Sequence, residues 1–143
     1  MDLDKSAKLT LNYRFKVLID NQPVSFAKVT GLNMNVETEM ISEGGHNGTG
    51  YILEVPAKSS NVMRLERGIY KKDTSILAKL RPGMYLNQGV VVMVLGPGGE
   101  IQIKYSAERA VVTKWEVSEL NAENGQVLVS TFEIAYTRLA LLD

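Results

Sequence analysis

Most of this chain alternates apolar and polar residues with the two-residue period of a half-buried β-strand. Between Tyr13 and Ile19 every second residue is aromatic or branched aliphatic. The segment Val90–Leu95 differs because all of its residues are apolar, so we expect it to be covered on both faces. Strands are predicted at 13–20, 24–29, 32–41, 51–55, 62–66, 90–95, 101–105, 111–117 and 126–139.

Short runs of glycine, proline and asparagine separate these segments and predict the turns between them. Asp20–Pro23 and Gly96–Gly99 are such runs, and the Asn124-Gly125 pair is typical of a tight hairpin. Many strands with evenly spaced turns favour a mainly β fold, either a sandwich or a barrel.

A single short helix is predicted between residues 73 and 80. Asp73 or Thr74 can cap it, because their side-chain oxygens accept hydrogen bonds from the first free backbone N–H groups. The apolar residues that would then share one side of the helix are Ile76, Leu77 and Leu80.

The segment 32–67 predicts a long hairpin with a glycine-rich tip, longer than a core of this size requires. Two interpretations remain open: an arm that reaches over a neighbouring molecule, or an ordinary hairpin folded on its own barrel. If the arm packs on a neighbour, unlike charges would meet and set the register; otherwise they are solvated charges of little consequence. The acidic residues are Glu37, Glu39 and Glu43, and the basic residues are Arg64, Arg67, Lys71 and Lys72.

The composition narrows the possible function classes. A length of 143 residues predicts one domain. Sixteen basic residues balance sixteen acidic ones, which argues against a nucleic-acid-binding module and permits self-association. Cysteine is absent and His46 is the only histidine, which excludes thiolate metal sites, cysteine nucleophiles and multi-histidine sites.

Candidate catalytic patterns are weak. Glu37 and Glu39 would lie about 7 Å apart on one strand face, a spacing close to that of glycosidase carboxylates, but no aromatic sugar platform accompanies them. Gly96–Gly99 precedes a strand, so no helix N-terminus would face a phosphate. Trp115 has the period of a core residue. We predict no catalytic, cofactor-binding or metal-binding residues and expect a structural or assembly function.

The N-terminus shows no basic region followed by an apolar stretch, so no signal peptide is predicted. The longest apolar run is Val90–Leu95, far shorter than the roughly 20 residues that a membrane helix requires. We therefore expect synthesis in the cytoplasm and no stable membrane binding.

Several short motifs follow one another in a fixed order over nearly the whole chain. They are Tyr13–Asp20, Phe26–Leu32, Glu37–Ile41, Val62–Ile69, Asp73–Ser75, Trp115–Ser118 and Phe132–Ala135. Their order resembles that of the tail tube proteins of contractile phages and the inner tube proteins of phage-tail-like contractile injection systems, which are related to type VI secretion tubes.

This resemblance implies a single tail-tube-like domain over residues 1–143 with a long hairpin arm at about 32–67. The implied fold is two packed antiparallel sheets in a β-barrel-like arrangement with one short flanking helix. Six subunits would form a hollow ring, and rings would stack into a tube that sheath contraction drives through a target envelope. The implied partners are further copies of the chain, sheath and baseplate proteins, and a luminal cargo of protein effector or phage DNA. The particle would be assembled in a bacterial or archaeal cell.

The same resemblance suggests which residues meet other subunits and which line the lumen. The expected inter-subunit contacts are Met34, Val36, Glu37, Glu39, Met40, Glu43, Arg64, Arg67, Lys71 and Lys72. A polar sheet face that lines either the lumen or the sheath-facing exterior would comprise Glu100, Gln102, Lys104, Thr131 and Glu133.

Two alternatives remain open at this stage. The helix segment lacks the tryptophans usual in the family, and the chain is short at both ends, which leaves room for a tube-initiating ring at the baseplate hub. A different class of function, a small β-barrel ligand-binding module or an enzyme with its site on loops, would require a monomer with a concave pocket.

Overall fold

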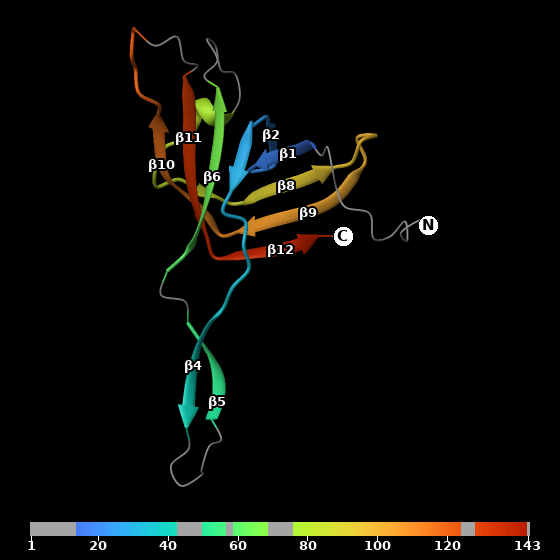
Figure 1. Ribbon diagram of the computed structural model, residues 1–143, viewed down its shortest axis with the longest axis vertical. Helices are drawn as coiled ribbons and strands as arrows, with labels where there is room; N and C mark the ends of the chain where they lie inside the picture. The colour runs from blue at the N-terminus through green and yellow to red at the C-terminus, as the bar shows by residue number, and fades with distance from the viewer. Residues whose placement is uncertain (1–13, 43–49, 57–58, 69–75, 124–127, 143) are drawn as a thin grey trace.

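The computed structural model describes residues 14–42, 50–56, 59–68, 76–123 and 128–142 (Figure 1). Within these segments the strands form two five-stranded antiparallel sheets and one separate two-stranded sheet. The two large sheets pack face to face, and the two-stranded sheet projects away from them (Figure 1). The predicted fold class is confirmed as mainly β with two packed antiparallel sheets. The expected barrel does not close, because each sheet keeps two separate edge strands.

We call the first large sheet sheet A. Its hairpin between β1 and β2 is a two-residue turn in which Asp20 and Asn21 both have positive φ, at 49° and 68°. Such a turn matches the right-handed twist of the strands and confirms the predicted turn. In spatial order, sheet A contains β12 (Arg138–Leu142), β9 (Ile101–Glu108), β8 (Val90–Leu95), β1 (Arg14–Ile19) and β2 (Gln22–Val24).

We call the second large sheet sheet B. Its two central strands, β6 and β11, pair over eight residues each, from Asn61 opposite Tyr136 to Gly68 opposite Val129. In spatial order, sheet B contains β3 (Lys28–Thr30), β6 (Asn61–Gly68), β11 (Val129–Tyr136), β10 (Ala110–Val117) and β7 (Tyr85–Leu86).

The core lies between the two sheets and uses alternate residues of every long strand. Val17 and Ile19 of β1 are buried as their period predicts, and they face Leu65 of β6 and Ile134 of β11 within one hydrophobic cluster. The largest fully buried side chain belongs to Tyr136. Fully burying side chains of this size contributes about 1.5–3 kcal/mol each, so this layer provides the main stabilisation of the fold.

The strand predicted at 126–139 is in fact two strands in different sheets. β11 ends at Tyr136 and β12 begins at Arg138. Between them the backbone N–H of Thr137 donates to the carbonyl oxygen of Glu108 at 3.1 Å, where the chain crosses from sheet B to sheet A. The buried positions change from even to odd numbers at this corner: Ile134 and Tyr136 are buried in β11 and Leu139 is buried in β12, and all three belong to the same core.

The predicted helix is only a four-residue 3₁₀ turn, η2 (Ile76–Lys79). Leu77 and Leu80 are buried, so the expected apolar side is correct, although the regular helix is not. The expected caps Asp73 and Thr74 lie outside the described residues.

The expectation that Trp115 belongs to the core is wrong. Its side chain is 50% exposed, because the register of β10 shifts between Val112 and Lys114 and the strand then runs past the core. The indole stacks on Phe132 with ring centroids 6.4 Å apart, and its Nε1–H donates to Ser130 Oγ at 3.0 Å.

Candidate assembly surfaces

The most distinctive surface is a two-stranded antiparallel sheet formed by β4 (Glu37–Ser42) and β5 (Gly50–Val55), which we call the arm. It extends well beyond the two large sheets (Figure 1). The strand predicted from Leu32 begins only at Glu37, because residues 32–36 have no ladder pairing. The return strand predicted at 62–66 belongs to β6 of sheet B and not to the arm.

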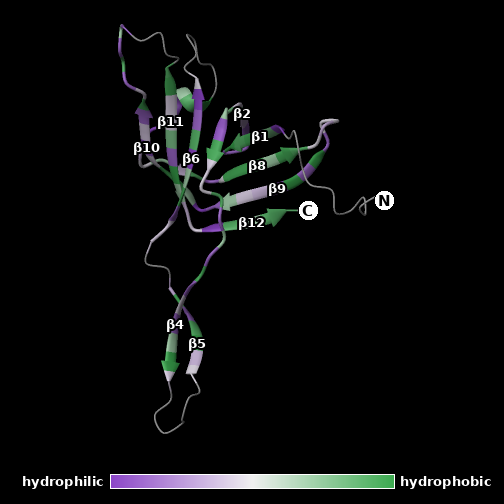
Figure 2. Cartoon of the chain, in the orientation of Figure 1, coloured by the Kyte–Doolittle hydropathy of each residue, from purple (hydrophilic) through white to green (hydrophobic). Residues whose placement is uncertain are grey.

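Both strands of the arm contain hydrophobic residues (Figure 2), and exposed apolar side chains lie on both of its faces. Met40 and Ile52 lie opposite each other on one face and are 70% and 68% exposed. Ile41 and Tyr51 are opposite partners on the other face and are also exposed. An isolated two-stranded hairpin is at best marginally stable in water, and a projecting apolar surface of this kind marks an interaction site.

The charge of the arm is entirely acidic over its described residues. Glu37 and Glu39 lie on β4, and Glu54 lies on β5, while neither strand contains lysine or arginine. The arm is therefore apolar and negatively charged at once, which favours a partner surface that is apolar and positively charged.

A buried tyrosine holds the chain where it leaves sheet B for the arm. The hydroxyl of Tyr136 donates to the carbonyl oxygen of Gly31 at 2.6 Å and accepts from the backbone N–H of Asn33 at 3.1 Å. Gly31 has a φ of +88°, and a Cβ at this position would lie 2.1 Å from the carbonyl oxygen of Val62. This junction explains why residues 32–36 leave the strand geometry that their period predicts.

The Tyr136 anchor leads to a first prediction. Tyr136→Phe should lower the free energy of unfolding by about 1–3 kcal/mol, because two partly buried backbone groups lose their hydrogen-bond partner while the ring still fills the core. Amide hydrogen exchange at Asn33 should accelerate in the same variant. The matched control is Tyr85→Phe, whose side chain is exposed, and which should change neither quantity. Unchanged stability and exchange in Tyr136→Phe would contradict the anchoring role.

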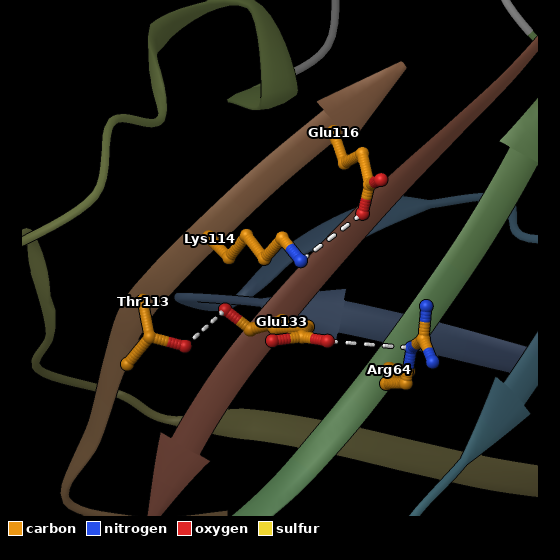
Figure 3. Close-up of polar contacts among 5 residues, drawn as sticks. All are labelled: Arg64, Thr113, Lys114, Glu116 and Glu133. Carbon is orange, nitrogen blue, oxygen red and sulfur yellow. Dashed lines mark hydrogen bonds and ion pairs between the residues drawn. The ribbon is translucent and has the colours of Figure 1, made fainter. Parts of the chain in front are cut away.

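The outer face of sheet B, meaning the side turned away from the core, carries both acidic and basic side chains, some of which are drawn in Figure 3. Arg64 Nε lies 3.5 Å from Glu133 Oε1, and Lys114 Nζ lies 3.2 Å from Glu116 Oε2. Thr113 Oγ1 donates to the backbone carbonyl of Glu133 at 3.0 Å. Among the described residues this face carries as many acidic as basic side chains: Lys28, Arg64 and Lys114 against Glu66, Glu116 and Glu133.

The outer face of sheet A is more apolar and more basic. Register places Leu18, Val91, Ser106 and Ala140 in one row across four strands, and Lys16, Met93, Lys104 and Leu142 in the next row. Val91 and Met93 are half-buried, so β8, which was expected to be covered on both faces, is fully buried only on the side of Val90 and Val92. The charged residues of this face in the described part of the sheet are Arg14, Lys16, Lys104, Arg138 and Glu108.

The structure distributes the expected contact residues over three regions. Met34 and Val36 are exposed in the segment before the arm, and Glu37, Glu39 and Met40 lie on the arm itself. Arg64 lies on the outer face of sheet B, while Arg67 is only 9% exposed and points into the core side of β6. The remaining three, Glu43, Lys71 and Lys72, lie outside the described residues.

The five residues expected on one polar face do not share a face. Gln102 and Lys104 belong to the outer face of sheet A, whereas Thr131 and Glu133 belong to that of sheet B. Glu100 lies in the connection between β8 and β9. Sequence alternation assigns each residue to one side of its own strand, but it does not show which sheet the strand joins.

Metal sites, membrane-spanning helices and ligand pockets are the other features to consider among the described residues. No group of three or more metal-ligating side chains occurs among the residues that the structure describes. The same residues include no helix that is sufficiently long and apolar to span a bilayer. A recess of about 400 Å³ between the sheets is lined mainly by apolar side chains, with Lys28 as the polar side chain among them, whereas small-molecule sites add several placed polar groups to an apolar lining. Its lining residues are Phe15, Ala27, Lys28, Val29, Leu32, Val92 and Val94.

The fold is similar to those of solved chains from contractile particles. A chain in the PVC sheath–tube complex of an extracellular contractile injection system, in the extended state, has a TM-score of 0.78 at 16% identity, over 95% of this chain and 93% of that chain. A chain in the tube-terminating cap of the anti-feeding prophage has a TM-score of 0.73 at 14% identity, over 99% of each. A chain in the baseplate of that prophage has a TM-score of 0.67 at 21% identity, over 94% and 95%.

At these identities the structural likeness establishes the fold, and family membership is established by sequence. No curated protein matches the sequence significantly. Residues 11–140, nearly the whole chain, match the family model of the T4-like virus tail tube protein gp19. The chain therefore belongs to this family of structural tail tube proteins.

Proposed function

We propose that this protein is a structural subunit of the inner tube of a phage-tail-like contractile injection system. Six copies form a ring with a hollow lumen, and rings stack into a tube. Contraction of a surrounding sheath drives the tube through a target envelope, and cargo, either a protein effector or phage DNA, passes through the lumen. The subunit is made in the cytoplasm of a bacterial or archaeal cell and has a mechanical, non-catalytic function.

The arm is the observation that carries this proposal. It exposes apolar side chains on both faces, including Met40 and Ile52, and it projects away from its own core (Figure 1). A subunit that contacts neighbours on both sides of such an arm forms heterologous contacts, which close into rings or extend as filaments. The open edges of both sheets also gain pairing partners when subunits join side by side.

The assemblies that contain chains of similar fold suggest the partners. Similar chains occur in a sheath–tube complex and in a baseplate of contractile particles. We therefore propose that this subunit contacts sheath and baseplate proteins in addition to its own copies, and that it does not bind membranes stably.

For the lumen we propose the outer face of sheet B. Its ion pairs, Arg64 with Glu133 and Lys114 with Glu116, leave a polar surface with balanced charge. A surface of this kind stays hydrated and lets cargo slide past without strong adhesion. Thr131 lies within it, next to Glu116 on the adjacent strand.

The absence of native cysteine makes the lumen testable by labelling. In intact tubes of a Thr131→Cys variant, a small maleimide should react, whereas a maleimide attached to a protein too large for the lumen should react at least tenfold more slowly. The dissociated subunit, as the control, should react with both reagents. Equal labelling by both reagents in intact tubes would contradict the assignment.

A terminating or initiating ring of the same particle is the second candidate. It is favoured by the likeness to a chain of a tube-terminating cap, which extends over 99% of both chains. Copy number per particle distinguishes the two, since a bulk tube subunit repeats along the tube and an end ring occurs once.

Imaging of the purified protein tests the proposed function itself. Negative-stain microscopy and sedimentation at high protein concentration should show six-membered rings or stacked rings. A chain that stays monomeric at high concentration would contradict the proposal. Binding of a small ligand in the recess between the sheets by such a monomer would favour a ligand-binding module instead.

A further inference from the structure

We propose that the outer face of sheet A is the acceptor for the arm of a second copy, with Glu39 of the arm beside Lys104 of the acceptor. This inference rests on the proposed function, because it requires copies of the chain to meet. It concerns which of the two outer faces the arm covers.

The first argument is apolar surface that the chain leaves partly uncovered. β8 is apolar at every position, yet sheet B covers only its inner side, and no strand within the described part of the chain packs on the other. Leu18, Val91 and Met93 form a continuous half-buried patch on that outer side. A partner that covers this patch with apolar side chains removes them from water.

The second argument is charge. The outer face of sheet A carries four basic side chains and one acidic side chain among its described residues. The acidic side chain is that of Glu108, whose Oε2 lies 3.9 Å from Arg138 Nε. The outer face of sheet B carries equal numbers of acids and bases in its described part. An arm with acidic residues and no basic ones on its described strands therefore complements sheet A and not sheet B.

The third argument is that one face of the arm carries both apolar side chains and carboxylates. Glu39 shares its face with Leu53, its direct partner, and with Ile41 two positions along β4. This face combines carboxylates with a line of apolar side chains, as the acceptor combines Lys16 and Lys104 with Met93 between them. The opposite face, with Met40 and Ile52, remains available for another copy.

The dimensions of the two surfaces agree. A six-residue strand is about 20 Å long, and the four strands from β1 to β12 extend over about 15 Å. Lys16 and Lys104 are separated by two strand spacings, about 10 Å, while alternate residues of a strand lie about 7 Å apart. The long side chains of lysine bridge this difference, so one arm can lie across the face and place carboxylates next to both lysines.

Charge reversal tests the pairing in the full-length protein. Lys104→Glu and Glu39→Lys should each raise the concentration needed for ring and tube assembly by about tenfold at low salt, and the double variant should recover most of this loss. The matched control is Lys79→Glu, an exposed reversal on η2, which should have little effect alone and should not rescue Glu39→Lys. Light scattering and sedimentation measure the assembly.

Cross-linking provides a readout that does not depend on charge. A Glu39→Cys protein mixed with a Lys104→Cys protein should give heterodimers with a short bifunctional maleimide after assembly, whereas Glu39→Cys with Lys79→Cys should not. If wild-type tubes form but neither charge rescue nor this cross-link occurs, sheet A is not the acceptor and the proposed function stands. If the wild-type chain stays monomeric, the proposed function and this contact both fail.

Discussion

A double variant of the arm, Met40→Thr with Ile52→Thr, should abolish tube formation at concentrations where the wild-type protein assembles. Both side chains are among the most exposed apolar groups of the structure, and they lie opposite each other on one arm face. Burying an aliphatic or thioether side chain contributes about 1.5–3 kcal/mol, so removing two from a contact weakens it by roughly a hundred- to ten-thousand-fold. Threonine retains a high strand preference, so the hairpin itself should survive.

The control for this variant changes polar neighbours on the same arm face and keeps both apolar side chains. Thr38→Ser with Ser42→Thr alters the same face of β4 on either side of Met40 and leaves both large apolar side chains in place. This control should assemble at wild-type concentrations. Sedimentation of both proteins, with circular dichroism to confirm the β fold, decides the outcome. Normal tubes from the Met40 and Ile52 double variant would show that this arm face carries no contact.

Gly31→Ala should destabilise the folded subunit by about 3 kcal/mol or more. The new Cβ would meet the carbonyl oxygen of Val62 at 2.1 Å, and the backbone φ of +88° is itself costly for a residue with a side chain. The neighbouring backbone must shift to relieve this contact, and it is the same backbone that Tyr136 holds. The variant should therefore lose both stability and the direction in which the arm leaves the body.

Gly83→Ala is the matched comparison for Gly31→Ala. Gly83 has a φ of +96°, but a Cβ there would have no atom within 4 Å, so its substitution costs only the backbone strain of about 1–2 kcal/mol. Chemical denaturation of the dissociated subunits gives both values. Equal losses in the two variants would show that the close approach to Val62 does not constrain the fold.

The inward-facing residues of the long strands were predictable from sequence because their period is local. Val17 and Ile19 in β1, and Phe132 and Ile134 in β11, are buried as alternation predicts. Alternation carries no information about a corner, however, so β11 and β12 appeared as one strand. The Thr137 hydrogen bond to Glu108, which marks the corner, joins residues far apart in the chain.

The other incorrect predictions also arise from interactions between residues that are far apart in the sequence. Residues 32–36 have a strand-like pattern, but Tyr136, about a hundred residues away, takes backbone groups of Gly31 and Asn33 as hydrogen-bond partners. Trp115 has the period of a core residue, and a register shift in β10 carries it past the core. The polar residues of β9 and β11 were predicted on one face, because the sequence does not show that these strands belong to different sheets.

The sequence predicted that the arm exists but did not predict where it lies. The sequence identified an over-long apolar and acidic hairpin around Glu37 and Glu39, but it left open whether this hairpin covers its own body or a neighbour. The structure shows the arm extended away from both large sheets (Figure 1). The junction of Gly31 with Tyr136 determines the direction in which the hairpin leaves the body. That direction decides which surface the apolar strands of the arm can pack against.

Electron cryomicroscopy of the assembled protein, at a resolution that traces the backbone, tests the central claim most directly. Hexameric rings around an open lumen are predicted, with each arm lying on another copy and the ion pairs of sheet B facing the channel. A solitary chain whose arm folds against its own sheets, or an assembly in which the arm touches no other copy, would contradict the account.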